Sequence, residues 1–183
     1  MQRVQKSFSV ESIDEFKSKI LIWAQQYEAI SWLDSNKYNQ KYSSFDAVLA
    51  VDEFTSIKTD YTNAFDKLKE YQSITNDYLF GYLSYDLKND VENLSSSNFD
   101  GINFPALHFF QPKVIFLLKD NQLEVKYLAS DDFSVEKVLE DVLNQDTSYN
   151  VPENRLYIVP RITKNGYIEK VEKLRQQSKI DDI

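Results

Sequence analysis

Two short apolar segments on either side of a polar turn constrain the fold of this chain more than any other feature. Residues 113–118 and 123–128 are rich in β-branched and aromatic side chains, and Lys119-Asp120-Asn121-Gln122 separates them. Two such segments joined by a short polar turn predict a β-hairpin. At least part of the sheet is therefore expected to be antiparallel.

Helices and strands alternate irregularly along the rest of the chain. Ser12 and Ser134 stand where a helix N-cap is expected, and Asp60 is expected to cap another helix. The apolar spacing predicts helices over 12–28, after Asp60, from 134 and over 163–178, and strands over 5–10, 29–33, 45–50, 54–58, 78–87 and 155–162. The absence of a strict strand–helix–strand alternation favours an α+β fold with a mixed, largely antiparallel sheet and packed helices.

The polar segment 146–154 contains the one plausible domain boundary. We therefore expect one domain over residues 1–150, and a connecting strand and helix over 151–183.

Composition excludes several classes of function. The net charge of −8 argues against a nucleic acid or an anionic membrane as partner, because no basic surplus exists to neutralise phosphates. The chain has no cysteine, so disulfides, thiolate metal sites and a cysteine nucleophile are excluded. Its three glycines cannot form a Gly-x-Gly-x-x-Gly loop. No signal peptide or membrane-spanning segment is visible, which predicts a cytoplasmic protein.

His108 is the one histidine of the chain, and any catalytic triad would have to use it. It lies within the apolar segment Leu107-His108-Phe109-Phe110. A buried or half-buried structural histidine is therefore a better interpretation than a catalytic one.

The segment Phe80-Gly81-Tyr82-Leu83-Ser84-Tyr85-Asp86-Leu87, with Glu92 five residues further on, predicts a strand that leads into a helical turn. It resembles the Phe-Gly-Tyr-x-x-Tyr-Asp-Leu-x-x-x-x-Glu signature in the amino-terminal half of component I of aminodeoxychorismate synthase and anthranilate synthase. The resemblance extends to residues 32–35, 42–48 and 161–174. It implies structural roles for Gly81, Tyr82, Tyr85, Asp86 and Glu92.

This resemblance implies a parent enzyme that converts chorismate and ammonia to 4-amino-4-deoxychorismate for folate and p-aminobenzoate synthesis. Its partners would be the catalytic domain of the same protein and a glutamine amidotransferase subunit, and its cofactor would be magnesium. The family's catalytic lysine and magnesium-binding glutamates lie beyond Ile183. We therefore expect no catalytic residue, metal ligand or cofactor in this chain, and no activity from the chain alone. The alternatives are an anthranilate synthase component I fragment, serving tryptophan synthesis, and a stand-alone amino-acid-binding or partner-docking module.

The resemblance also implies a tryptophan pocket, formed by Ser35, Tyr42, Ser43, Phe45 and Asp46. Hydroxyls and a carboxylate suit the charged groups of an amino acid, and aromatic rings suit its indole. The alternative is a loop packed on a sheet edge, in which Tyr42 and Phe45 are core residues. Asp34 and Ser44 depart from the family pattern. The acidic pairs Asp131-Asp132 and Asp181-Asp182 are expected to be solvated rather than metal-binding.

Overall fold

The computed structural model describes residues 2–38, 41–42, 44–94, 99–130, 133–148 and 157–178. The chain divides into two units, Met1–Thr147 and Ser148–Ile183. The expected boundary between residues 150 and 151 lies outside the described residues.

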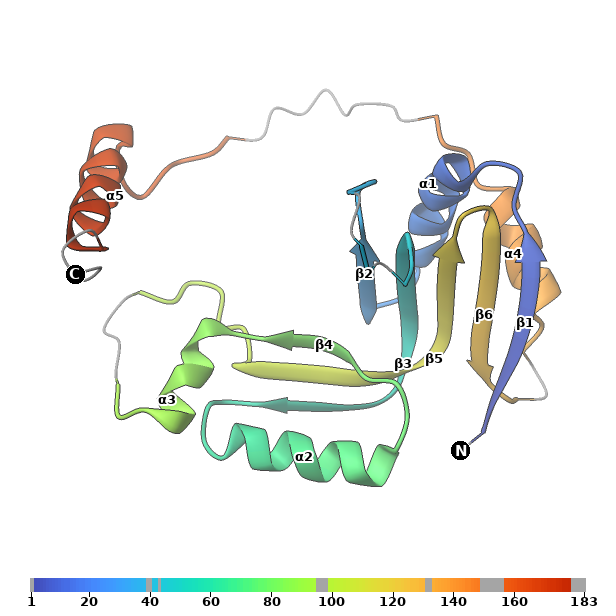
Figure 1. Cartoon of the computed structure of the whole chain (residues 1–183), viewed down its shortest axis with the longest axis horizontal. Helices are drawn as coiled ribbons and strands as arrows, with labels where there is room; N and C mark the ends of the chain where they lie inside the picture. Colours follow the sequence, from blue (N-terminus) through green and yellow to red (C-terminus); the bar gives the residue numbers. More distant parts are fainter. Residues whose placement is uncertain are drawn as a thin grey trace. The chain divides into compact units, whose positions relative to one another are not determined.

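The first unit is an antiparallel sheet with helices packed on it (Figure 1). Its elements in the described residues are β1 (Arg3–Ser9), α1 (Ile13–Ala24), β2 (Ile30–Asp34), β3 (Ala47–Thr59), α2 (Ala64–Thr75), β4 (Phe80–Leu83), a 3-10 turn (Tyr85–Leu87), α3 (Lys88–Val91), β5 (Leu107–Lys119), β6 (Gln122–Leu128) and α4 (Val135–Leu143). Five strands follow the order β1-β6-β5-β3-β2, and β4 pairs with the first half of β5. Every strand pair described is antiparallel, which confirms the predicted α+β class.

The predicted hairpin forms between β5 and β6. Lys119 pairs with Gln122, so both residues belong to the strands. The turn therefore consists of Asp120 and Asn121 and is shorter than the four residues expected. Asp120 has a left-handed backbone with φ of 50°, a conformation that Asp and Asn tolerate in tight turns. Its backbone N–H donates to the Asp46 carboxylate at 2.6 Å. A residue 74 positions earlier in the sequence, directly before β3, therefore stabilises the turn.

The two strands expected over 45–50 and 54–58 are one continuous strand, β3, which corrects the prediction. Asp52 has φ of 62°, and the pairing with β5 shifts register between Glu53 and Thr55. An extra residue of this kind bends a strand without reversing it. β3 and β5 therefore run together from the part of the sheet beside β6 to the part beside β4 (Figure 1). We call residues 54–59, 80–83 and 107–111 the arm of the sheet.

The described residues contain three buried apolar clusters, and the two largest include helix residues. The larger lies where α1 and α4 pack on one face of the sheet, and its fully buried members include Ile20, Leu49, Phe116, Val125 and Val142. The smaller lies between the arm and α2, and it contains Ala64, Leu87, Ala106 and Leu107. Burial of these side chains is the main favourable term for each half of the bent sheet.

Local signals set the helix start at two of the three predicted caps. The Ser12 and Ser134 hydroxyls accept backbone N–H groups of Glu15 and Lys137, each at 3.4 Å, as an N-cap does. The prediction for Asp60 is wrong, because its carboxylate accepts the Thr62 N–H in the preceding turn and α2 begins only at Ala64. The predicted helix over 12–28 also ends early, at Ala24.

The second unit contains one helix among its described residues, α5 (Lys164–Ser178), as predicted. The Thr163 hydroxyl accepts the Gly166 N–H at 3.2 Å at its start. The strand expected over 155–162 does not form in its described part, residues 157–162. In the described residues of either unit, no helix has the length and apolar character needed to cross a membrane.

Candidate ligand-binding site

The signature segment forms β4, the 3-10 turn and α3, at the edge of the arm. Tyr82 is half-buried, with its ring 6.0 Å from those of Phe104 and His108. Tyr85 is 83% exposed, and the Lys88 ammonium lies 4.5 Å from its ring centre.

Three polar side chains of the segment 80–92 differ in their surroundings. The Asp86 carboxylate pairs with Lys88 at 3.3 Å. Glu92 is exposed, and its N–H ends α3 by donating to the Lys88 carbonyl at 2.9 Å. Ser84, although outside the motif's fixed positions, has a buried hydroxyl without a hydrogen-bond partner in the described part of the chain.

Gly81 is required for close strand approach rather than for an unusual backbone angle. A Cβ atom at this position would lie 2.0 Å from the His108 carbonyl oxygen and 2.7 Å from the Phe109 Cα. Its φ is not positive. Any side chain would therefore separate β4 from β5.

Four of the five residues predicted for the tryptophan pocket come together. Ser35, Tyr42, Phe45 and Asp46 line one open depression of about 340 Å³, where β2 ends and β3 begins. Ser43 lies outside the described residues. Tyr42 is 83% exposed and Phe45 is 43% exposed, so neither is the core residue that the alternative interpretation required.

Asp46 joins this depression to the rest of the sheet. Its carbonyl accepts the Ser35 N–H at 2.9 Å, and its N–H donates to the Leu118 carbonyl at 2.8 Å. Because its carboxylate also accepts the Asp120 N–H, part of the acceptor capacity that a ligand would use is already occupied.

Asp34 adds a second carboxylate to the same depression. Burial alone would raise the pKa of Asp34, but hydrogen bonds from the Asn36 N–H and the Lys17 ammonium outweigh burial and lower it. The depression thus combines an ionised carboxylate with aromatic side chains. Such an arrangement can hold an ammonium group beside an apolar ring.

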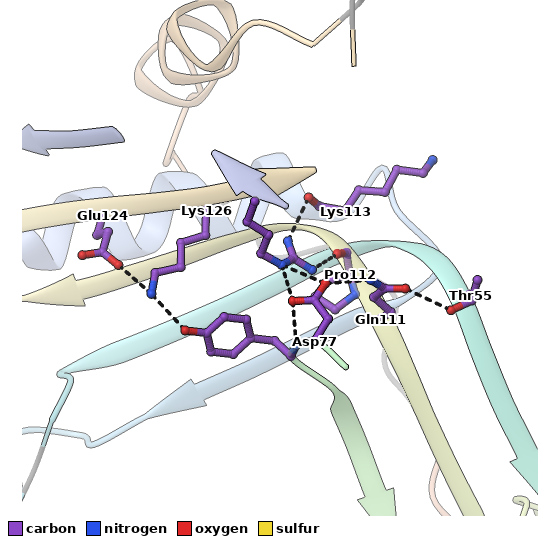
Figure 2. A network of polar contacts seen from close by, with 9 residues as sticks. Thr55, Asp77, Gln111, Pro112, Lys113, Glu124 and Lys126 are labelled. Atoms are coloured by element: carbon purple, nitrogen blue, oxygen red, sulfur yellow. Dashed lines mark hydrogen bonds and ion pairs between the residues drawn. The ribbon is translucent and has the colours of Figure 1, made fainter. Parts of the chain in front are cut away.

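A buried polar network lies where β5 leaves the arm, and sequence reasoning did not predict it (Figure 2). The Arg3 guanidinium contacts Asp77 at 2.7 Å, with only 8% and 7% of these side chains exposed. Gln111 donates to Asp77 at 2.6 Å, and Arg3 donates to the Pro112 carbonyl at 2.6 Å. Burial would raise the pKa of Asp77, but the bonds from Arg3, Gln111 and the Tyr78 N–H outweigh it and lower the pKa.

No local pattern could have revealed this network, because Arg3 and Asp77 are 74 residues apart in the sequence. Its members are saturated with one another, so we interpret it as a structural clamp between β1, β5 and the segment before β4. Lys126 extends it by donating to the Tyr78 hydroxyl at 3.0 Å, beside Glu124 (Figure 2).

Among the described residues, no three His, Asp or Glu side chains gather as metal ligands would. The acidic pairs Asp131-Asp132 and Asp181-Asp182 lie outside those residues.

Comparison with models of known protein families finds no match. A search of curated proteins finds no match either.

Proposed function

We propose that this chain is the amino-terminal, non-catalytic region of component I of an aminodeoxychorismate synthase, with a weak tryptophan-binding site. The parent enzyme would convert chorismate and ammonia to 4-amino-4-deoxychorismate, with magnesium in its catalytic domain and ammonia from a glutamine amidotransferase subunit. The observation that carries the proposal is the gathering of Ser35, Tyr42, Phe45 and Asp46 around one depression, at positions that the family resemblance had indicated.

The form of the depression determines how strongly it can bind. It is shallow, its aromatic side chains are largely exposed, and the Asp46 carboxylate already accepts one N–H. A ligand held there stays partly hydrated, and its charged groups pair incompletely. Because a hydrogen bond to a charged group contributes about 1.5–3 kcal/mol, each missing pair weakens binding roughly ten- to hundredfold.

Titration calorimetry with L-tryptophan tests the site. We expect weak, saturable binding to the whole chain, and a further loss in the Ser35→Ala variant. Ser31→Ala, on the same strand β2, serves as the matched control and should bind as the unaltered chain does. Tight binding, or binding that Ser35→Ala leaves unchanged, would show that the site is elsewhere.

A chorismate-consumption assay with ammonium and magnesium tests the enzymatic part of the proposal. We expect no turnover by this chain, and turnover when the parent's catalytic domain is supplied. Turnover by the chain alone would contradict its assignment as the non-catalytic region. Formation of anthranilate by the reconstituted enzyme would instead support anthranilate synthase, and binding of tryptophan without any chorismate chemistry would support a stand-alone module.

A further inference from the structure

A second cavity, of about 430 Å³, lies between the loop after α1 and the bend of β3 and β5. Its lining includes Tyr27, Glu28, Asp52, Glu53, Lys58 and His108. The left-handed Asp52 and the register shift after Glu53 bring this part of β3 beside the loop, where the Asp52 N–H donates to the Ala29 carbonyl at 3.3 Å. Lys58 and His108 are directly opposite each other in the β3–β5 register.

His108, which lines this cavity, has one side-chain nitrogen without a hydrogen-bond partner in the described part of the chain. Its Nε2 is buried and has no hydrogen-bond partner among the described residues. The nearest carboxylate oxygen, Oε2 of Glu53, is 3.8 Å away, too long for a hydrogen bond but short enough for one atom to bridge the two. The other oxygen of Glu53 accepts from the Ser56 hydroxyl at 2.7 Å.

The protonation state of His108 determines whether its Nε2 atom can accept a hydrogen bond. Burial lowers the pKa of His108, the Lys58 charge lowers it further, and Glu53 opposes both without reversing them. The imidazole is therefore neutral at pH 7, and one of its nitrogens is an acceptor. In the tautomer that carries its proton on Nδ1, Nε2 is an unpaired acceptor beside a carboxylate, and it suits a donor group that carries positive charge.

The charges around the cavity favour the same kind of donor. Asp52 is paired with Lys113 at 3.0 Å. The remaining charged lining groups are Glu28, Glu53 and Lys58, two negative and one positive. Lys58 is exposed and forms no ion pair within the described part of the chain. A ligand that carries both an ammonium and a carboxylate complements this set better than a simple anion or cation does.

We propose that this cavity binds a small zwitterion of the α-amino-acid class. The ligand's ammonium donates to Glu53 Oε2 and His108 Nε2, and its carboxylate lies against the Lys58 ammonium. The side chain of Tyr27, whose ring is 5.1 Å from that of Trp23, supplies an apolar wall for the rest of the ligand. The site is separate from the depression at Ser35 and Asp46, and it does not depend on the function proposed for that depression.

The lone histidine makes a direct test possible, because its imidazole NMR signals need no assignment among others. The whole labelled chain is titrated at pH 7 with glycine or L-alanine, and in parallel with acetate, methylamine and L-lactate. We expect a saturable shift of the His108 signals with the two amino acids. Acetate and methylamine each lack one charged group. Their affinity should be lower than that of the amino acids by roughly tenfold or more. L-Lactate carries a hydroxyl in place of the ammonium and should also bind more weakly.

Variants then test the assigned contacts. Glu53→Gln and Lys58→Met should each reduce the affinity for glycine roughly ten- to hundredfold. Glu70→Gln and Lys69→Met, both exposed positions on α2, are the matched controls and should leave it unchanged. Chain folding is checked by circular dichroism for every variant.

Three outcomes would overturn the proposal: no saturable shift with either amino acid, equal shifts with acetate and methylamine, or unchanged affinity in both cavity variants. The unaltered chain alone decides the first two, so the test does not depend on any variant folding. A Ser35→Ala chain that still shows the His108 shift would confirm that this cavity is independent of the tryptophan site.

Discussion

At the residue scale, the Arg3–Asp77 pair is the interaction whose loss should lower the free energy of unfolding most. Both side chains are more than nine-tenths buried, and each also bonds to other polar groups of the network. Removing one member of a buried, hydrogen-bonded ion pair leaves the other charge without compensation, which costs about 3–5 kcal/mol in comparable cases. We therefore regard this pair as essential to the clamp between β1 and β5.

The stabilisation that this pair provides should decrease at acidic pH. Because the pKa of Asp77 in the folded chain lies below the ordinary value of 3.8, its ionised form stabilises the fold above about pH 4. That contribution is lost as the pH falls through the lowered pKa. We expect Asp77→Asn to lower the free energy of unfolding by about 3 kcal/mol at pH 7, and by clearly less at pH 2–3.

Urea unfolding of both chains across this pH range is the measurement. Asp66→Asn, at an exposed position in the first turn of α2, is the control and should show no such convergence. A difference between Asp77→Asn and the unaltered chain that stayed constant with pH would show that Asp77 is not ionised in the pair.

Asp46 supplies a second test at this scale. Its carboxylate accepts the Asp120 N–H of the β5–β6 turn from a partly exposed position. Asp46→Ala should therefore lower the urea midpoint by an amount that corresponds to about 1 kcal/mol. Asp46→Asn keeps an acceptor in the same place and should lose less, whereas equal losses in the two variants would attribute the effect to charge rather than to the hydrogen bond.

At the element scale, the packing of β4 against β5 depends on Gly81. A methyl group there would meet backbone atoms, which cannot move as the end of a flexible side chain can. We expect Gly81→Ala to destabilise the chain by about 3 kcal/mol or more, at or beyond the upper range for overpacked sites. The loss should appear as faster amide hydrogen exchange in β4 and in the facing half of β5.

Gly166→Ala in α5 is the matched control for that substitution. Its Cβ would lie 3.3 Å from the Thr163 hydroxyl, the end of a side chain, and alanine has the higher helix propensity. The net change should stay below about 1 kcal/mol. A Gly81→Ala chain as stable as Gly166→Ala would mean that β4 is free to move away from β5.

At the scale of the whole molecule, the second unit presents apolar side chains that nothing in its own described part covers. Ile168 and Leu174 on α5 are 45% and 66% exposed. Exposed apolar side chains promote association when they gather on a surface. We expect the sedimentation coefficient of the whole chain to rise with concentration, and the variant Ile168→Glu/Leu174→Glu to remain monomeric. If the unaltered chain is monomeric at every concentration, the result would favour a self-sufficient module.

The local parts of this fold were accessible from the sequence. The β5–β6 hairpin, the helix starts at Ser12 and Ser134, and α5 each depend on residues within a few positions of one another. Turn chemistry, N-caps and apolar periodicity act over such distances, so a single sequence carries the signal. The proximity of Ser35 to Asp46 was also predicted, but from family resemblance rather than from physical pattern.

Interactions between distant residues were decided only by the tertiary structure. The continuity of β3 through Asp52 depends on pairing with β5 some sixty residues later, as the Asp52–Lys113 ion pair illustrates. The Arg3–Asp77 clamp and the meeting of Glu53 with His108 likewise join segments that no local pattern relates. Local chemistry determined which elements this chain forms, whereas long-range strand pairing determined where the sheet bends and which polar groups meet at the bend, because those contacts exist only once the sheet is assembled.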